Sequence, residues 1–192
     1  IISRTEPMSE SPRREADDMS TIVYTSGSTG MPKGVMLSFG PMADCVAEIQ
    51  NIIPIGRNDR MLSYLPLAHV FERFLVETAT LIYGFKVYFA ESLDTFVADL
   101  NRARPTIFAS VPRLWQKFQL GVFQKLPPNK LGLLLKIPII RGLIRKKVLK
   151  GLGLDQVGYA VSGSAPIPAP LIDWYRSLGL ELLEAYGMSE NF

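Results

Sequence analysis

The sequence predicts an α/β fold with mostly parallel sheets and flanking helices. Short apolar runs with β-branched and aromatic residues recur along the chain, and stretches with helical spacing of apolar residues separate most of them. Strands that alternate with helices in this way form parallel βαβ units. The apolar content of 47% and the charged content of 20% are those of an ordinary globular protein.

The first residues differ from the rest. Residues 1–19 are mostly polar, charged and proline-bearing, which is typical of a linker or a solvated loop. From residue 20 onward the alternating pattern begins. Strands are expected at the β-rich apolar runs 21–25, 61–65, 86–89, 106–110, 157–161 and 180–183.

Helices are expected between most of these strands, at 41–53, 68–82, 93–103 and 168–179. Asp94 lies in the first turn of the third helix, where the helix dipole favours an acid. The fourth helix has prolines near its start and Gly179 where a C-terminal cap belongs. A further helix is expected to begin near Pro138.

Cysteine and histidine each occur once. A single cysteine, Cys45, excludes an internal disulfide and fits a reducing compartment, so a cytoplasmic location is expected. Cys45 lies in an apolar helical pattern and is expected to be a buried packing residue. With His69 as the one histidine, a structural zinc site is not expected. No apolar run has the length that a membrane span needs.

Residues 24–35, YTSGSTGMPKGV, form a glycine- and hydroxyl-rich loop directly after a predicted strand. Glycines let backbone N–H groups turn toward an anion, hydroxyls add donors, and Lys33 adds a positive charge. These properties favour a polyphosphate-binding loop. The segment is not the G-x-x-x-x-G-K-[ST] loop, because Gly34 follows Lys33. Composition alone leaves a flexible surface turn as an equal alternative.

The full string resembles the phosphate-loop signature of the AMP-forming acyl- and aryl-CoA synthetases, the adenylate-forming superfamily. Three further segments resemble motifs of that family and occur in its order. LPLAHVFER at 65–73 is similar to the second core motif of long-chain members. VSGSAP at 161–166 is similar to the loop beside the adenine, and YGMSE at 186–190 to the adenine and magnesium motif.

The resemblance implies an ATP-dependent reaction in two halves. A carboxylate attacks the α-phosphorus of ATP to give an acyl-adenylate and pyrophosphate, and the thiol of coenzyme A then displaces AMP. Because the first half brings an anion toward a polyanion, catalysis would be largely positioning and charge neutralisation. Residues 20–192 would then be part of the ATP- and acyl-binding N-terminal domain. The substrates would be ATP, a fatty acid and coenzyme A.

Roles for individual residues follow from the same resemblance. The phosphate-binding residues would be Thr25, Ser26, Gly27, Ser28, Thr29, Gly30 and Lys33. The other ATP-binding residues would be Gly163, Ser164, Ala165, Pro166, Glu184, Ala185, Tyr186, Gly187 and Ser189, with Tyr186 stacking on adenine and residues 163–166 facing it from the other side. Ser189 would donate a hydrogen bond to the α-phosphate, and Glu190 would bind Mg²⁺. Lys33, Ser189 and Glu190 are therefore the expected catalytic residues.

Each of these residues also has a plainer interpretation. Taken singly, Glu190 is more simply a solvated carboxylate and Tyr186 a core or rim aromatic. His69 is expected to bind the acyl group rather than to act as a base, since the carboxylate is already ionised at neutral pH. Trp115 lies on an apolar helical face in SVPRLWQKFQ, which spacing alone assigns to the core. The resemblance makes Trp115 an expected acyl-tunnel residue.

Charge is distributed unevenly along the chain. Residues 100–154 contain twelve Lys or Arg and no Asp or Glu, whereas the remainder contains nine basic and eighteen acidic residues. Ile140, Ile144 and Val148 share one helical face within this segment, and most basic residues lie outside that face. The segment 136–150 is therefore either a solvated helix or a contact with anionic lipid headgroups or the phosphates of coenzyme A. Aromatic residues are sparse in it, so nucleic acid is not an expected partner.

The chain starts at Ile1 and stops just after the YGMSE motif, which indicates a fragment. The family's hinge, ribose-binding aspartate and C-terminal domain with a catalytic lysine are not in this sequence. We expect the parent protein to be the enzyme and this part alone to turn over little substrate. A non-catalytic nucleotide-binding module, or the adenylation of an aryl or amino acid, is the alternative. Acyl chain length and oligomeric state are not readable from the sequence.

Overall fold

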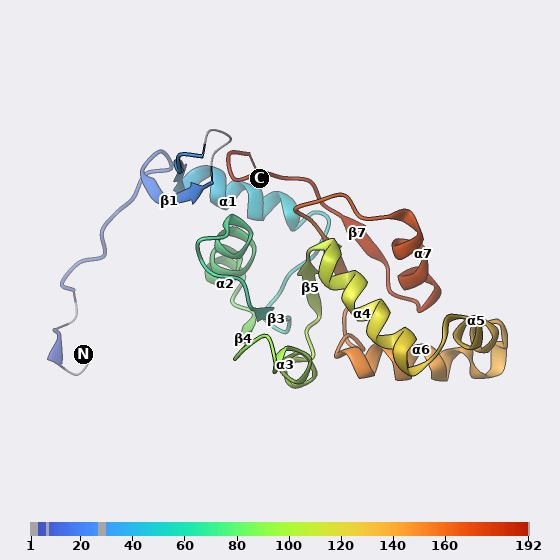
Figure 1. Ribbon diagram of the computed structural model, residues 1–192. Helices are drawn as coiled ribbons and strands as arrows, with labels where there is room; N and C mark the ends of the chain where they lie inside the picture. The colour runs from blue at the N-terminus through green and yellow to red at the C-terminus, as the bar shows by residue number, and fades with distance from the viewer. Residues whose placement is uncertain (1–3, 7, 27–29, 192) are drawn as a thin grey trace.

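The computed structural model describes residues 4–6, 8–26 and 30–191 (Figure 1). Within these residues the strands form three sheets, and two of the sheets are parallel. One pairs β3 (Arg60–Ser63) with β4 (Lys86–Phe89), and the other orders β5 (Ile107–Ser110), β6 (Tyr159–Ser162) and β7 (Leu182–Glu184). The predicted α/β fold with mostly parallel sheets is confirmed.

The remaining sheet is antiparallel. β1 (Met19–Thr25) and β2 (Lys33–Ser38) pair in antiparallel fashion, so the glycine-rich segment joins two strands of a hairpin. β2 was not among the predicted strands. Gly34 permits the close pairing, because a Cβ there would lie 2.9 Å from the side chain of Ile22. The hairpin places Thr25 opposite Lys33, at the point where the loop leaves the two strands.

The helices are α1 (Phe39–Ile49), α2 (Ala79–Tyr83), α3 (Phe96–Ala103), α4 (Pro112–Lys125), α5 (Pro128–Lys136), α6 (Pro138–Leu152) and α7 (Ala169–Ser177). Of these, α1, α3, α6 and α7 lie close to their predicted positions. Proline occupies the first turn of α4, α5, α6 and α7, where its missing N–H costs no hydrogen bond. The segment expected to be helical at 68–82 is helical, but Glu72–Thr78 forms a π-helix, η2, before α2 begins. α5 was not predicted.

Two large clusters of buried side chains form the core. The larger surrounds Trp115, Phe108 and Tyr175, whose rings meet edge to face around the indole. The second lies between α1, η2 and the β3–β4 sheet, with Val46 and Leu75 among its members. A small third cluster under the β1–β2 hairpin contains Val23. The hairpin is therefore attached to the domain by few apolar contacts.

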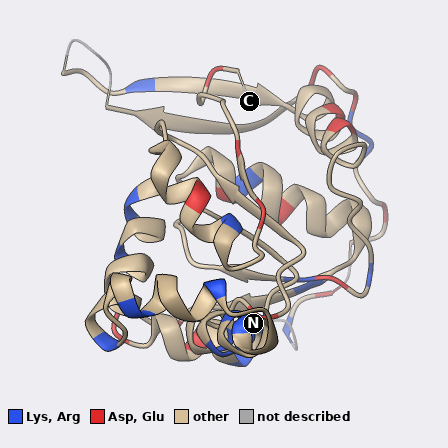
Figure 2. Cartoon of the chain, turned by 90° about the vertical axis from the view of Figure 1, so that its right-hand side faces the viewer, with Lys and Arg blue, Asp and Glu red and all other residues tan. Residues whose placement is uncertain are grey.

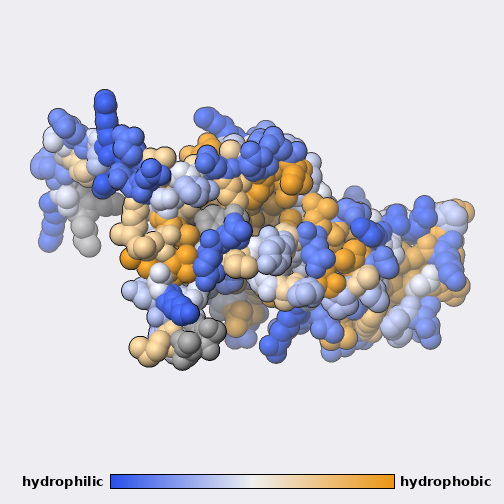
Figure 3. Space-filling view, turned by 90° about the horizontal axis from the view of Figure 1, so that it is seen from above, coloured by the Kyte–Doolittle hydropathy of each residue, from blue (hydrophilic) through white to orange (hydrophobic). Residues whose placement is uncertain are grey.

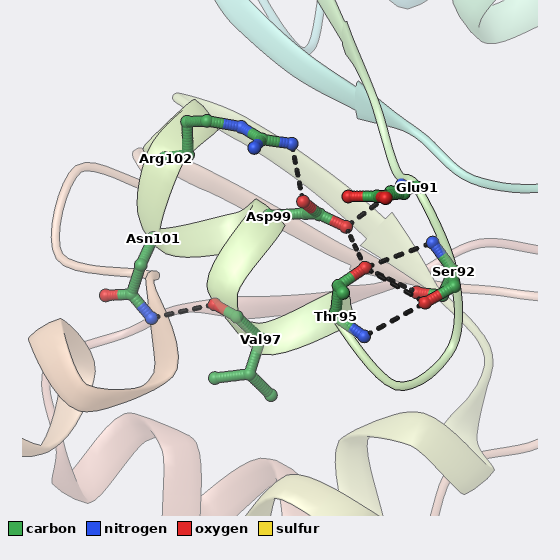
Figure 4. A network of polar contacts seen from close by, with 7 residues as sticks. All are labelled: Glu91, Ser92, Thr95, Val97, Asp99, Asn101 and Arg102. Carbon is green, nitrogen blue, oxygen red and sulfur yellow. Dashed lines mark hydrogen bonds and ion pairs between the residues drawn. The ribbon is translucent and has the colours of Figure 1, made fainter.

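A polar network joins the loop after β4 to α3 (Figure 4). The buried carboxylate of Asp99 accepts hydrogen bonds from the backbone N–H of Glu91 at 3.0 Å and the hydroxyl of Thr95 at 2.8 Å. Arg102 donates to the other oxygen of the same carboxylate at 2.6 Å. These donors, led by the N–H of Glu91, lower the pKa of Asp99.

Two expectations about exposure can be compared with the structure. Cys45 is half-buried rather than buried, because it lies at the edge of the α1 face that packs on the core, and burial raises its thiol pKa. Among the described residues, no helix combines the length and apolarity needed to cross a membrane.

Candidate nucleotide-binding site

A cleft of about 580 Å³ lies between the β1–β2 hairpin and the C-terminal segment. The β1–β2 hairpin and the C-terminal segment lie side by side at this point (Figure 1). The lining residues come from four separate parts of the sequence: Thr25, Ser26, Lys33, His69, Val70, Ser164, Gly187, Met188, Ser189 and Glu190. Each of the four predicted motifs contributes at least one of them.

The hairpin supplies one wall of the cleft. Lys33 is the first residue of β2 and pairs with Thr25, the last residue of β1, whose hydroxyl lies 3.5 Å from the carbonyl oxygen of Lys33. This pairing holds the ammonium and the two hydroxyls of Thr25 and Ser26 at the same end of the hairpin. Gly30 has a φ of 79°, a conformation that glycine adopts without strain. The predicted phosphate-binding residues Gly27, Ser28 and Thr29 lie outside the described residues.

The opposite wall is the C-terminal segment. The N–H of Ala185 donates to the carbonyl oxygen of Ser162 at 2.8 Å, which continues the β6–β7 pairing past the strand end. Reciprocal backbone hydrogen bonds of 3.0 and 3.1 Å between Met188 and Asn191 then close a tight turn. Ser189 and Glu190 occupy the tip of this turn and line the cleft. Their position therefore depends on the register of the third sheet.

The loop after β6 forms the junction between the two walls. Gly163 donates its N–H to the carbonyl oxygen of Ser110 at 3.0 Å, and Ser164 follows with a φ of 67°. A non-glycine residue in this left-handed region carries strain, which proteins retain mainly at functional sites. The carboxylate of Glu184 accepts a hydrogen bond from the N–H of Ile167 at 3.1 Å and so holds the far end of the loop.

His69 lies at the entrance to a small recess beside the cleft. His69 and Ser164 line both spaces, and Tyr64, Phe71 and Ser110 line the recess. The Nδ1 atom of His69 is buried and has no hydrogen-bond partner among the described residues. An acceptor or donor of a bound molecule would therefore satisfy a polar atom that is otherwise unpaired.

The backbone around His69 is held by the π-helix. Glu72 is buried; its N–H donates to the carbonyl oxygen of His69, and its carboxylate accepts a hydrogen bond from the hydroxyl of Ser63. Burial raises the pKa of Glu72, and the hydrogen bonds from Ser63 and from the N–H of Leu65 offset part of that rise. Glu72 thereby ties the end of β3 to the loop that carries His69. π-Helical turns occur frequently at functional sites.

Some predicted site residues lie away from the cleft. Trp115 is fully buried in the larger core cluster, and its indole N–H donates to the carbonyl oxygen of Val161 at 3.3 Å. It lines neither the cleft nor the recess, which matches the core position that its spacing predicts. Tyr186 is 89% exposed beside the cleft. Ala165 and Pro166 are exposed and do not line the cleft.

Sequence reasoning missed several residues around the site. Val70 and Met188 line the cleft, and Tyr64 and Ser110 form the polar wall of the recess. The Tyr64 hydroxyl donates to the Ser110 hydroxyl at 2.9 Å, and burial raises the pKa of Tyr64 to about 12. Tyr64 and Ser110 lie at the ends of predicted strands, where ligand-binding residues collect in α/β folds.

The side chains that line the cleft are of the types that can hold a nucleoside triphosphate and its metal ion. Lys33 supplies a cation, and Thr25, Ser26 and Ser189 supply hydroxyl donors. Glu190 is the carboxylate of the lining set, and no group of three metal-binding side chains occurs among the described residues. Mg²⁺ bound to phosphates uses one or two protein carboxylates and completes its shell with phosphate oxygens and water. Glu190 meets that requirement.

Comparison with known proteins relates this cleft to a family. The profile of AMP-binding enzymes matches residues 3–192. An acyl-CoA ligase 891, peroxisomal, of Penicillium brevicompactum is 34% identical over 92% of the chain, and a fatty acyl-CoA synthetase A of Dictyostelium discoideum is 34% identical over 91%. A long-chain-fatty-acid–CoA ligase of Xenopus laevis is 30% identical over 89%. The chain spans 28 to 29% of the length of these three relatives.

Solved structures agree in fold. The adenylation domain of a carboxylate reductase from Mycobacterium chelonae superposes with a TM-score of 0.74, at 27% identity, over 98% of this chain and 29% of that chain. The A-PCP didomain of a carboxylic acid reductase from Segniliparus rugosus, in complex with AMP, gives a TM-score of 0.69 at 27% identity, over 96% of this chain and 25% of that one. The chain belongs to the AMP-binding enzyme family, as its four motifs and their convergence on one cleft indicate.

Proposed function

We propose that this chain forms the ATP- and acyl-binding part of an AMP-forming fatty acid–CoA ligase. The ligase would join a fatty acid to AMP and then transfer the acyl group to coenzyme A, releasing AMP and pyrophosphate. The observation that carries the proposal is the cleft that Lys33 and Glu190 share. The names of the relatives, which are fatty-acid and acyl-CoA ligases, support the choice of substrate class.

The family resemblance implies a role for each polar residue that lines the cleft, and their shared position supports these roles. Lys33 and the hydroxyls of Thr25 and Ser26 would hold the β- and γ-phosphates and stabilise charge on the leaving pyrophosphate. Ser189 would donate to the α-phosphate, where the carboxylate attacks. Glu190 would bind Mg²⁺, which neutralises phosphate charge when present.

The recess supports a position for the acyl carboxylate. His69 lines both spaces, so its unpaired Nδ1 could donate to a carboxylate oxygen placed between the recess and the cleft. No base is needed, because a carboxylic acid is ionised at neutral pH. The exposed ring of Tyr186 is available to stack on adenine, opposite the loop from Gly163 to Pro166. Trp115, buried in the core, would support the recess from behind rather than line it.

Two further partners belong to the proposal. Coenzyme A would accept the acyl group. Fatty acids partition into bilayers, so we also propose that the basic segment 136–150 contacts an anionic membrane surface. The cytoplasmic location expected from the sequence stays a prediction, and one relative's name places that relative in the peroxisome.

The test is pyrophosphate release by the full-length protein with carboxylic acids of graded chain length. We expect release that requires ATP and a fatty acid, followed by thioester formation when coenzyme A is added. Release with aryl or amino acids alone would favour the alternative substrates. ATP binding without any release would favour a non-catalytic nucleotide-binding module. Residues 1–192 alone are expected to release little pyrophosphate, and equal rates for both proteins would contradict that expectation.

A further inference from the structure

The hairpin of α5 and α6 is the most basic part of the molecule. Residues 128–152 contain seven Lys or Arg and no Asp or Glu. None of these seven forms an ion pair within the described part of the chain. The two helices pack on each other and project from the rest of the domain (Figure 1), and basic residues gather on them (Figure 2). Their charge is thus available to an external anionic partner.

α6 has two apolar rows rather than one. Val148 and Leu149 pack against the larger core cluster and Leu152 belongs to it, so this row attaches the helix to the domain. Arg145, on the attached side, donates to the carbonyl oxygen of Ser177 at 2.8 Å. The second row contains Ile139, which is 88% exposed, and Leu143, which is 69% exposed. The apolar residues of α6 are therefore not confined to the side that packs on the domain.

The exposed apolar row continues into a basic row. Ile139, Leu143, Lys146 and Lys150 are spaced by four, three and four residues, which places them along one side of a helix. Lys146, Lys147 and Lys150 are all exposed. On α5, Leu133 is 64% exposed and the neighbouring Lys136 is exposed as well. In the view from above, apolar and hydrophilic atoms lie side by side over the projecting end (Figure 3).

We propose that the outer side of the α5–α6 hairpin docks on an anionic lipid bilayer, with Ile139 and Leu143 entering the interface and the three lysines on the headgroups. Interfacial helices combine apolar side chains with a lysine-rich polar face, and both properties are present here. The phosphates of coenzyme A could pair with the lysines, but they would leave Ile139 and Leu143 exposed to water. The combination therefore favours a bilayer over a soluble polyanion.

The choice of a lipid bilayer as the partner rests on the proposed function. Docking would bring the enzyme to a surface that holds fatty acids. The α5–α6 hairpin is nevertheless separate from the nucleotide cleft, and none of its residues lines that cleft. Membrane binding and adenylate formation can therefore be measured and lost independently.

The experiment is co-sedimentation of the full-length protein with vesicles of phosphatidylcholine alone or with added phosphatidylserine. We expect binding to the anionic vesicles only, weaker at high salt. The triple variant K146Q/K147Q/K150Q should lower partitioning about a hundredfold, since each basic residue near such a surface contributes about fivefold. The double variant I139Q/L143Q should also lower partitioning into the anionic vesicles, although it leaves the charge of the protein unchanged. The control R13Q/R14Q/K86Q removes three exposed cations elsewhere and should bind as the wild type does.

Several outcomes would overturn the proposal. These are equal binding by the wild type and the lysine variant, binding to neither kind of vesicle, and loss of binding in the control alone. A weaker affinity of the lysine variant for coenzyme A, with vesicle binding intact, would assign the segment to coenzyme A instead. Pyrophosphate release with a dissolved fatty acid, measured on the same variants, separates failure of docking from failure of the proposed activity.

Discussion

Lys33 and Glu190 line the same cleft, although they lie near opposite ends of the chain. The β1–β2 hairpin holds Lys33, and the turn closed by Met188 and Asn191 holds Glu190. A cation and a carboxylate that face one space can bind a polyphosphate and its metal together.

Lys33→Met and Glu190→Gln are each expected to lower the rate of pyrophosphate release by the full-length protein about a hundredfold or more. Because both groups act on one polyphosphate, the double variant should lose less than the product of the two single losses. Lys86→Met removes an exposed lysine from β4 and serves as the control. Independent, multiplicative losses would argue against a shared site.

Asp99→Asn tests the network between β4 and α3. The folded pKa of Asp99 is lowered, so its stabilisation is present above the unfolded value of about 3.9 and is lost as pH falls through the folded value. The variant should unfold more easily than the wild type at pH 7, and the difference should shrink below about pH 4. Urea unfolding of both proteins between pH 7 and about pH 3 measures this difference in unfolding free energy.

An exposed carboxylate in the same region provides the matched control. Asp94→Asn changes a residue just before α3 and should shift the unfolding free energy by less than about 0.5 kcal/mol. A deficit of Asp99→Asn that stays constant from pH 7 to about pH 3 would show that packing, rather than ionisation, accounts for the contribution of Asp99.

Gly153→Ala is expected to destabilise the domain by about 2 kcal/mol or more. Gly153 ends α6 with a φ of 74°, and a Cβ there would lie 2.8 Å from the backbone N of Asn101 and the carbonyl carbon of Leu100. Gly142→Ala, within the same helix, meets nothing within 4 Å and should stabilise by about 0.5–1 kcal/mol. Thermal unfolding of both variants distinguishes the two effects, and equal shifts would contradict the close approach of α6 to α3.

Ser164→Gly should leave the domain as stable as the wild type or more so, because glycine removes the cost of a φ of 67°. Ser164→Val should destabilise it by about 1–2 kcal/mol, since a β-branched residue tolerates this conformation poorly. Denaturant midpoints of the two variants give the comparison. Similar midpoints would indicate that the loop relaxes to another conformation on substitution.

Local patterns were sufficient for much of the fold. Strands and helices followed from the alternation of apolar runs and helical spacing, and β4, predicted at 86–89, occupies those residues in the structure. Helix boundaries followed from proline and glycine, as at Pro138. These features depend on short-range physics: proline lacks an N–H, and side chains repeat with the period of their element.

Other features depended on contacts between distant segments. The strand β2 was missed because Lys33–Ser38 begins inside the glycine-rich segment, and among the described strands it pairs with β1 alone. The π-helix at Glu72–Thr78 has the same apolar spacing as an α-helix, so the sequence could not separate them. The half-buried state of Cys45 likewise reflects what lies next to α1.

The four motifs were sufficient to predict the family, and the alternation of apolar runs with helical spacing was sufficient to predict the α/β class. The packing of distant segments brings Lys33 and Glu190 into one cleft, keeps Trp115 out of the cleft and the recess, and leaves Ile139 and Leu143 exposed. The physical reason is that periodicity specifies which side chains share a face of an element. The neighbour that covers that face, or leaves it in water, is set by the packing of segments far apart in the chain.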